Sequence, residues 1–388
     1  MHLPKPDPDS AAHGARVVSF LRDRIASAGG SIGFDEFMQH ALHAPGLGYY
    51  AAGSAKFGAA GDFVTAPEVS SLFGRVVARQ CADLLAQLPG AGILEPGAGT
   101  GRLAADVLTA LDRIGRPPAR YLILEPSAEL AARQREYLAR EAAELARRVA
   151  WIDDWPRDFR GVVLANEVLD ALPVARFMIR GTQVRELRVG LADGGFAWQD
   201  APAGPLLEAA VRGIESQLGA PLPEHYVSEV CLALPHWISG LAGCLADGLA
   251  LLFDYGVSRR EYYAAGKNGG WLRCHFRHRV HDDPLILAGI QDLSAWVDFT
   301  AVAGAAIDHG LDVAGYASQA GFLMHGGLEN ALAEAGAGLS AEHLELSRQV
   351  KLLTLPGEMG ENFKCMGLRK GSARAPAVLV ACDRAHTL

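Results

Sequence analysis

Short apolar runs alternate with amphipathic segments through the middle of the chain, and this alternation is typical of an α/β fold. Between the runs, apolar residues recur with helical spacing, as at Leu103, Val107 and Leu111. Strands that alternate with helices pair in parallel, so we expect a doubly wound, mostly parallel sheet with helices on both faces. The runs predict strands near residues 92–96, 120–125, 149–152, 162–166 and 249–254.

Further segments extend this pattern at both ends. Strands near 313–316 and 363–368 complete a seven-stranded sheet. Near the N-terminus, an amphipathic helix stopped by Gly29 and Gly30 precedes a second helix around 34–42. The composition of residues 1 to about 12 predicts disorder. The glycine-rich and aromatic segment from Pro45 to Glu68 predicts a long ordered loop over a site.

The domain organisation that we expect is a sheet domain with additions. The sheet domain comprises 91–172 and 248–388, and an N-terminal part, 1–90, carries helices and the loop that would cover a ligand site. An insertion at 173–247 begins with a hairpin at 177–187, and helices follow it. A second excursion occupies 257–310, and we expect both additions to form the substrate side.

The strand at 93–96 runs into glycines at alternate positions, and a helix follows. Gly97, Gly99 and Gly101 have no Cβ, so the backbone there is open to close approach by a ligand. The spacing is E-x-G-x-G-x-G, not the G-x-G-x-x-G of dinucleotide sites, because Arg102 stands where the third glycine would fall. This spacing is associated with S-adenosylmethionine, although a purely structural glycine turn is the alternative.

Acidic residues near this turn suit the parts of that cofactor. Glu95 is placed for its cationic amino group, and Ala98 lies within the turn. Glu125, at the carboxyl end of the next strand, is placed to accept hydrogen bonds from ribose hydroxyls. Asp153 follows the third strand and is our candidate for the adenine, a role that Asp154 could fill instead.

Pro67 and Glu68 would open the helix that carries Phe73 and Val77, and we count both as cofactor-site candidates. An acid at a helix start is also favoured by the helix dipole alone, so a structural role for Glu68 is equally consistent with the sequence.

Polar residues follow two further strands of the predicted sheet. Asn166, Glu167 and Asp170 come after the fourth strand, and Glu167 and Asp170 share a face if the turn is helical. Asp254 and Tyr255 follow the fifth strand. Because parallel sheets bind ligands at their carboxyl ends, we expect the first three to be catalytic and the other two to lie in the substrate region.

Composition excludes several classes of protein. The chain has 388 residues, half of them hydrophobic, and its net charge of −8 argues against non-specific nucleic-acid binding. No apolar run reaches the length of about 18 residues that spanning a membrane needs, so no membrane insertion is expected. Six cysteines without C-x-x-C spacing indicate reduced thiols, and with no recognisable targeting segment we expect a cytoplasmic protein.

Three histidines at intervals of three, His275, His278 and His281, superficially suggest a metal site. Two arginines interrupt them and nothing fixes the segment as a helix, so we expect no metal. A lid or a substrate wall is the preferred interpretation, with His278 and Asp282 making polar contacts.

Several motifs in a fixed order resemble the MidA family, which includes the mitochondrial arginine methyltransferase of complex I assembly. The resemblance covers about residues 16 to 370, and Pro96, Ala66 and Ser294 are small departures from its pattern. The motifs, besides the glycine turn, are 46–50, 61–68, 166–173, 254–256, 292–299 and 359–364.

The resemblance implies a class I methyltransferase fold and an S-adenosylmethionine cofactor. Its mitochondrial member methylates an arginine of a respiratory complex subunit, so a protein arginine is the first acceptor to consider here. Independently, Glu167 and Asp170 stand where carboxylates would be needed to clamp a guanidinium.

Two other functions stay open on the sequence: a small-molecule methyltransferase, and a factor that binds the cofactor with little turnover. The oligomeric state is open as well, with a homodimer as one option.

Overall fold

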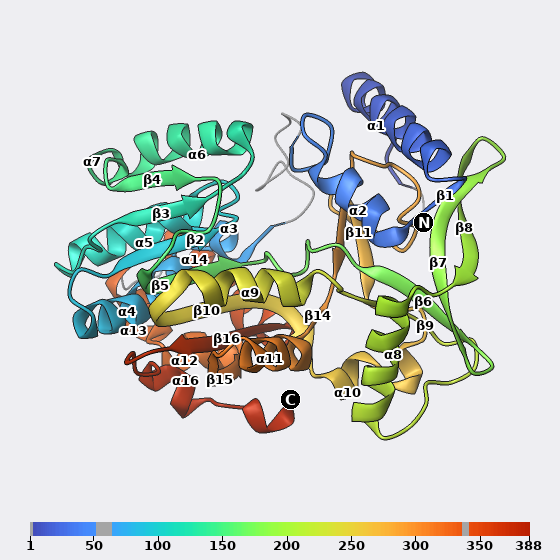
Figure 1. Cartoon of the computed structure of the whole chain (residues 1–388). Coiled ribbons are helices and arrows are strands. Elements are labelled where there is room, and N and C mark those ends of the chain that lie inside the picture. The colour runs from blue at the N-terminus through green and yellow to red at the C-terminus, as the bar shows by residue number, and fades with distance from the viewer. Residues whose placement is uncertain (1–2, 52–63, 336–340) are drawn as a thin grey trace.

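Within the residues that the computed structural model describes, 3–51, 64–335 and 341–388, seven strands lie side by side in one sheet (Figure 1). Their order is β15-β16-β10-β5-β2-β3-β4. The five strands from β10 to β4 are parallel to one another, and β16 is antiparallel to both of its neighbours. The two-residue β14, Val297–Asp298, also pairs with β10. The strands are β2 Gly92–Pro96, β3 Tyr121–Leu124, β4 Val149–Ile152, β5 Phe159–Asn166, β10 Leu245–Val257, β15 Asp312–Ser318 and β16 Phe363–Lys370.

Helices cover both faces of this sheet because its strands are apolar on both sides. Adjacent residues point to opposite faces, so Ile93 packs into one core and Leu94 into the other. The second core lies under α9 Leu234–Cys244 and α11 Phe299–Asp308. The first lies under α4 Ser71–Gln87, α5 Arg102–Arg113, α6 Ala128–Glu141, α12 Gln319–His325, α13 Leu328–Glu334, α14 Ala341–Thr354 and α16 Ala377–Ala381.

A second group of elements packs beside the central sheet (Figure 1). One apolar core joins the N-terminal helices to both smaller sheets, and another lies under α8. The elements are α1 Pro8–Ser27, β1 Ser31–Gly33, α2 Phe34–His43, β6 Ala175–Arg180, β7 Gln183–Ala192, β8 Gly195–Pro202, α8 Pro205–Leu218, β9 Val227–Val230, α10 Arg259–Tyr262, β11 Leu272–Phe276, β12 Arg279–His281 and β13 Asp292–Ala295.

The expected hairpin is present as β6 and β7, but a helix does not follow it directly. The next element is a third strand, β8, which pairs along one edge of β7. On the other edge β6 pairs with residues 183–186, and β1 from the N-terminal part pairs with residues 188–190. Residues from two parts of the chain that the sequence separates therefore share one sheet. In β8, Phe196 and Trp198 are aromatic residues two positions apart and so lie on one face of the strand, which is the strand signal that we missed.

The prediction of disorder before residue 12 was wrong, because α1 already begins at Pro8. Asp7 caps this helix by accepting a hydrogen bond from the Ser10 amide at 2.9 Å, and Pro8 occupies the first helical turn. Asp7 also pairs with Arg277 of the turn between β11 and β12. Half of the expected loop at 45–68, residues 52–63, lies outside the described residues.

Three glycines face one another where the central strands begin. Gly161 of β5 pairs with Gly92 of β2 on one side and with Gly248 of β10 on the other. A Cβ on Gly161 would lie 2.0 Å from the Gly92 carbonyl oxygen, and the φ of Gly161 is +140°. Only glycine fits this level of the sheet, so these positions fix where the three strands enter it.

We predict that Gly161→Ala lowers the free energy of unfolding by about 3 kcal/mol or more, because it adds both a clash with backbone and an unfavourable φ. Urea denaturation followed by circular dichroism measures the change. The matched control is Gly243→Ala in α9, where a Cβ meets no atom within 4 Å, and we expect it to be neutral or to stabilise by up to about 1 kcal/mol. Equal midpoints for the two variants would contradict the argument.

Candidate active site

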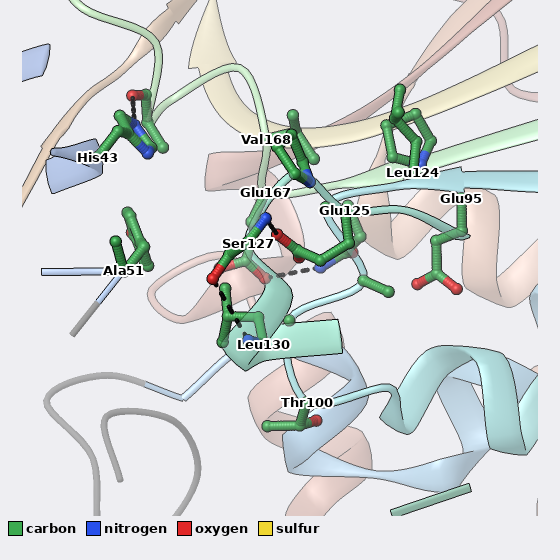
Figure 2. A pocket seen from close by; sticks show the side chains of 18 of the residues that line it. His43, Ala51, Glu95, Thr100, Leu124, Glu125, Ser127, Leu130, Glu167 and Val168 are labelled. Atoms are coloured by element: carbon green, nitrogen blue, oxygen red, sulfur yellow. Dashed lines mark hydrogen bonds between the residues drawn. The ribbon is translucent and has the colours of Figure 1, made fainter. Parts of the chain in front are cut away.

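A cavity of about 960 Å³ opens at the carboxyl ends of β2, β3, β4 and β5. Parallel pairing brings these ends to one edge of the sheet, as the sequence predicts. The end of α2 with the segment after it, the short helix α3, Ala66–Val69, and Trp237 of α9 also line the cavity. In Figure 2, Glu95 and His43 lie at opposite sides of this cavity, and Glu125 and Glu167 lie between them.

The glycine turn lies along the cavity with its backbone exposed to the open space. A Cβ on Gly99 would meet no protein atom within 4 Å, although its φ of +55° disfavours any other residue. Gly97 and Ala98 line the cavity too, whereas Gly101 begins α5 and packs against Gln134. The space beside Gly99 is therefore free for a ligand that lies against the main chain.

Glu95, the second-to-last residue of β2, lines the cavity, and only 2% of the residue is exposed. It accepts a hydrogen bond of 2.5 Å from the Tyr121 hydroxyl. Burial raises the pKa of its carboxyl to about 7, against the smaller opposing effect of that hydrogen bond. A cationic group bound beside Glu95 would stabilise the ionised form, which suits the predicted contact with an amino group.

Glu125 follows β3 directly, as predicted, and its carboxylate lines the cavity. It accepts hydrogen bonds from the Ser127 amide at 2.9 Å and from Gln134 Nε2 at 3.1 Å, the first of which is drawn in Figure 2. Burial raises the pKa of Glu125, while both hydrogen bonds lower it. Asp153 and Asp154 both line the same cavity beyond β4, so the alternative between them stays open.

Pro67 and Glu68 line the cavity, but the helix expected to start with them is interrupted. They belong to α3, and α4 begins separately at Ser71, capped by Ser70. Glu68 accepts a hydrogen bond of 2.5 Å from the Thr100 hydroxyl. This contact ties the N-terminal part of the chain to the glycine turn.

The other end of the cavity carries Glu167. The turn that holds it is not helical, so the condition under which Glu167 and Asp170 would share a helical face is not met. The φ of Glu167 is +53°, and its amide donates to the Phe253 carbonyl oxygen at 2.8 Å. The side chain accepts hydrogen bonds from the Ala66 amide at 3.2 Å and from Asn166 Nδ2 at 3.1 Å. Burial and the neighbouring Asp170 raise the pKa of Glu167 to about 8.

Asp170 lines the cavity beside Glu167, and Asp254 and Tyr255 support it from behind. Asp254 accepts hydrogen bonds from the Leu169 amide at 2.9 Å and the Asp170 amide at 3.2 Å. Tyr255 donates a hydrogen bond to the Asp170 carboxylate. Burial raises the pKa of Asp170 to about 7, and it raises that of Asp254 well above its usual range. Asp254 and Tyr255 do not line the cavity.

Sequence reasoning missed an aromatic wall at this end. His43 and Tyr50 line the cavity and stack with ring centroids 5.4 Å apart. The Tyr50 hydroxyl donates to Asp292 at 2.7 Å, and a ring nitrogen of His43 contacts the Ala171 carbonyl oxygen at 3.3 Å. Burial lowers the pKa of His43. Tyr50 and Asp292 both stand in motifs that carry the family resemblance, which was the available signal.

The histidine segment takes no part in the cavity wall. His278 lies in the turn between β11 and β12 with φ +59°, and Asp282 pairs with Arg273 at 3.5 Å. Neither residue lines the cavity, so the cavity does not support the substrate role that we expected for this segment. Among the described residues, no three histidine, cysteine or acidic side chains gather as metal ligands, and no helix is long and apolar enough to cross a membrane.

Comparisons with known proteins agree with this geometry. A family model for S-adenosyl-L-methionine-dependent methyltransferases matches residues 76–317. A methyltransferase structure from Burkholderia thailandensis, bound to S-adenosyl-homocysteine, superposes with a TM-score of 0.94 at 41% identity and covers 100% of both chains. A native structure from the same organism gives a TM-score of 0.92 at 40% identity, also over 100% of both.

Curated relatives extend the likeness. The "Protein arginine methyltransferase NDUFAF7 homolog, mitochondrial" of Drosophila melanogaster is 29% identical over 96% of this chain and 90% of its own. The mouse protein, "Protein arginine methyltransferase NDUFAF7, mitochondrial", is 30% identical over 73% of this chain and 68% of its own.

The fold and the cavity together define an S-adenosylmethionine-dependent methyltransferase of class I. The cofactor predicted from the glycine spacing is thereby confirmed, and the open space beside Gly99 and the carboxylates of Glu95 and Glu125 fit its parts. The chain belongs to the MidA family, to which the NDUFAF7 proteins also belong.

We predict that Glu125→Ala weakens S-adenosylhomocysteine binding by about 2 kcal/mol, because it removes hydrogen bonds to a charged acceptor. Isothermal titration calorimetry measures the affinity. Glu136→Ala, an exposed acid on α6, is the matched control and should leave it unchanged. An unchanged dissociation constant for Glu125→Ala would refute the ribose role.

Proposed function

We propose that this protein transfers the methyl group of S-adenosylmethionine to the guanidinium of an arginine in a protein substrate. The observation that carries the proposal is a cluster of carboxyl groups at one end of the cofactor cavity. Glu167 and Asp170 follow β5 and line the cavity, and Asp254 of β10 accepts a hydrogen bond from the Asp170 amide without lining it. The names of the relatives, protein arginine methyltransferases, support it independently.

Among the residues that the structure describes, these carboxyl groups have no positively charged side chain as a partner. The groups that raise or lower their pKa are other carboxylates, Tyr255, Asn166 and backbone amides. Across residues 3–51, 64–335 and 341–388, no lysine or arginine forms an ion pair with Glu167, Asp170 or Asp254. A bound cation would relieve their mutual repulsion, so this end of the cavity favours a positively charged acceptor.

A guanidinium suits this environment better than an ammonium does. It is planar, it keeps its charge because its pKa exceeds about 12, and its fork of N–H donors matches carboxylates bidentately. Its lone pair is delocalised, so it reacts only when it is held and polarised. Glu167 is itself held at two points, by the Ala66 amide and by Asn166, and is thus preorganised for such a contact.

When bound, S-adenosylmethionine supplies an electrophilic methyl group, and methylation of a guanidinium nitrogen releases one proton. Glu167 is the residue that we assign to accept it, since a carboxyl with a pKa of about 8 takes up a proton near neutral pH. Asp170 is the second carboxylate of the guanidinium clamp, and the hydrogen bond from Tyr255 holds it in place. Asn166 orients Glu167 through its amide.

The experiment that tests the proposal uses methyl-labelled cofactor with protein extract of the host and with a subunit of a respiratory complex. Label on arginine of a protein, identified by mass spectrometry, supports it. Label only in a small molecule would replace it with small-molecule methylation. Tight cofactor binding with no labelled product at all would favour a binding factor with little turnover.

We predict that Glu167→Gln lowers kcat by roughly a hundredfold or more and leaves the affinity for S-adenosylhomocysteine within about threefold, because the amide keeps the shape and loses the charge. Steady-state kinetics and calorimetry measure the two quantities. Glu208→Gln, an acid on the exposed start of α8, is the matched control. Parallel loss of cofactor affinity and activity would place Glu167 in the cofactor pocket instead.

We also predict that kcat/KM for an arginine substrate rises with pH between about 6 and 9. Glu167 and Asp170, with pKa values of about 8 and about 7 in the free enzyme, must ionise to hold a cation, and protonation below those values removes the clamp. The Glu167→Gln variant should lose the upper part of the rise. A pH-independent kcat/KM for the unaltered enzyme would contradict the assignment.

A further inference from the structure

Gln134 of α6 is fully buried and joins several parts of the cofactor site without lining it. Its Nε2 donates to the Gly99 carbonyl oxygen at 3.0 Å and to Glu125 Oε2 at 3.1 Å. Its Cα lies 3.6 Å from the position that a Cβ on Gly101 would take. One amide thus connects the glycine turn after β2 to the carboxylate after β3.

Trp151 of β4 fixes which way this amide points. Its indole Nε1 donates to Gln134 Oε1 at 2.9 Å. An indole N–H can only donate, so the amide must present its oxygen to Trp151 and its NH₂ group to Gly99 and Glu125. Without this contact the amide is free to turn its oxygen toward Glu125, where two acceptors would repel each other.

We propose that Gln134, oriented by Trp151, is a positioning residue that holds the Glu125 carboxylate and the glycine turn in the geometry that binds the ribose of the cofactor. The inference rests on the proposed contact of Glu125 with the ribose, but it assigns roles to two residues that lie outside the cavity wall. Three strands and α6 are thereby joined at one amide.

The electrostatics of Glu125 agree with this role. Burial disfavours the ionised form, and the hydrogen bonds from Ser127 and Gln134 favour it. An ionised carboxylate accepts from two hydroxyl groups at once, whereas a protonated one has less capacity to accept. Gln134 therefore orients the carboxylate and also helps to keep it charged.

The test compares S-adenosylhomocysteine with its 2′,3′-dideoxy analogue, which lacks the hydroxyls that Glu125 would hold. We expect Gln134→Leu to weaken S-adenosylhomocysteine about tenfold, and Trp151→Phe severalfold. Both should change the affinity for the dideoxy analogue less than twofold. A residue that merely supports the fold would weaken both ligands alike, so the difference between ligands is the diagnostic readout.

The matched control is Gln319→Leu, which removes another fully buried glutamine whose amide donates to a backbone carbonyl oxygen, in α12. It should leave both affinities unchanged. Should Gln134→Leu fail to fold, Trp151→Phe carries the test, since it keeps a six-membered aromatic ring at this position of β4 and removes the indole N–H that orients Gln134.

Glu125→Ala separates the two ways in which the inference can fail. If Glu125→Ala weakens S-adenosylhomocysteine and not the dideoxy analogue, while the Gln134 and Trp151 variants weaken both ligands alike, only the positioning role is overturned. If Glu125→Ala also weakens both ligands equally, the ribose contact itself is wrong, and the positioning role falls with it.

Discussion

The parallel pairing of β5 between β2 and β10 is the constraint on which the rest of the molecule depends. It directs three chain segments toward one edge of the sheet, where the glycine turn and Glu167 line the cavity and Asp254 holds the backbone of Asp170. The pairing is possible at its start only because Gly92, Gly161 and Gly248 allow the backbones to approach. A shift of one residue would also turn each apolar side chain toward the wrong helical layer.

The two ends of the cavity differ in how their charges are compensated. At the cofactor end, Glu125 is held by a backbone amide and by Gln134, and Glu95 by a tyrosine hydroxyl. At the other end, Glu167, Asp170 and Asp254 also accept hydrogen bonds, but burial first and then their mutual repulsion raise their pKa values. This uneven compensation leaves the acceptor end ready for a positive ligand, which is the physical basis of the arginine proposal.

Elements outside the methyltransferase sheet complete the acceptor end. The turn after α2 brings Tyr50, and β13 brings its partner Asp292, although 242 residues separate them in the chain. The Ala66 amide of α3 reaches Glu167 in the same way. The additions to the fold thus supply part of the cavity wall, and their joint apolar core includes Tyr49 and Leu293, the chain neighbours of Tyr50 and Asp292.

The sequence by itself determined the central sheet, the cofactor and the acids at the strand ends, because short apolar runs and glycine spacing are local signals. Tertiary structure decided the rest. Three contacts could not be predicted from local sequence, because each joins residues that are apart in the chain. They are the pairing of β1 with β7, the hydrogen bond of Tyr50 to Asp292 and that of Gln134 to Glu125. Likewise the raised pKa values arise from burial and from carboxylates brought together across β5 and β10, and neither is a property of a local sequence.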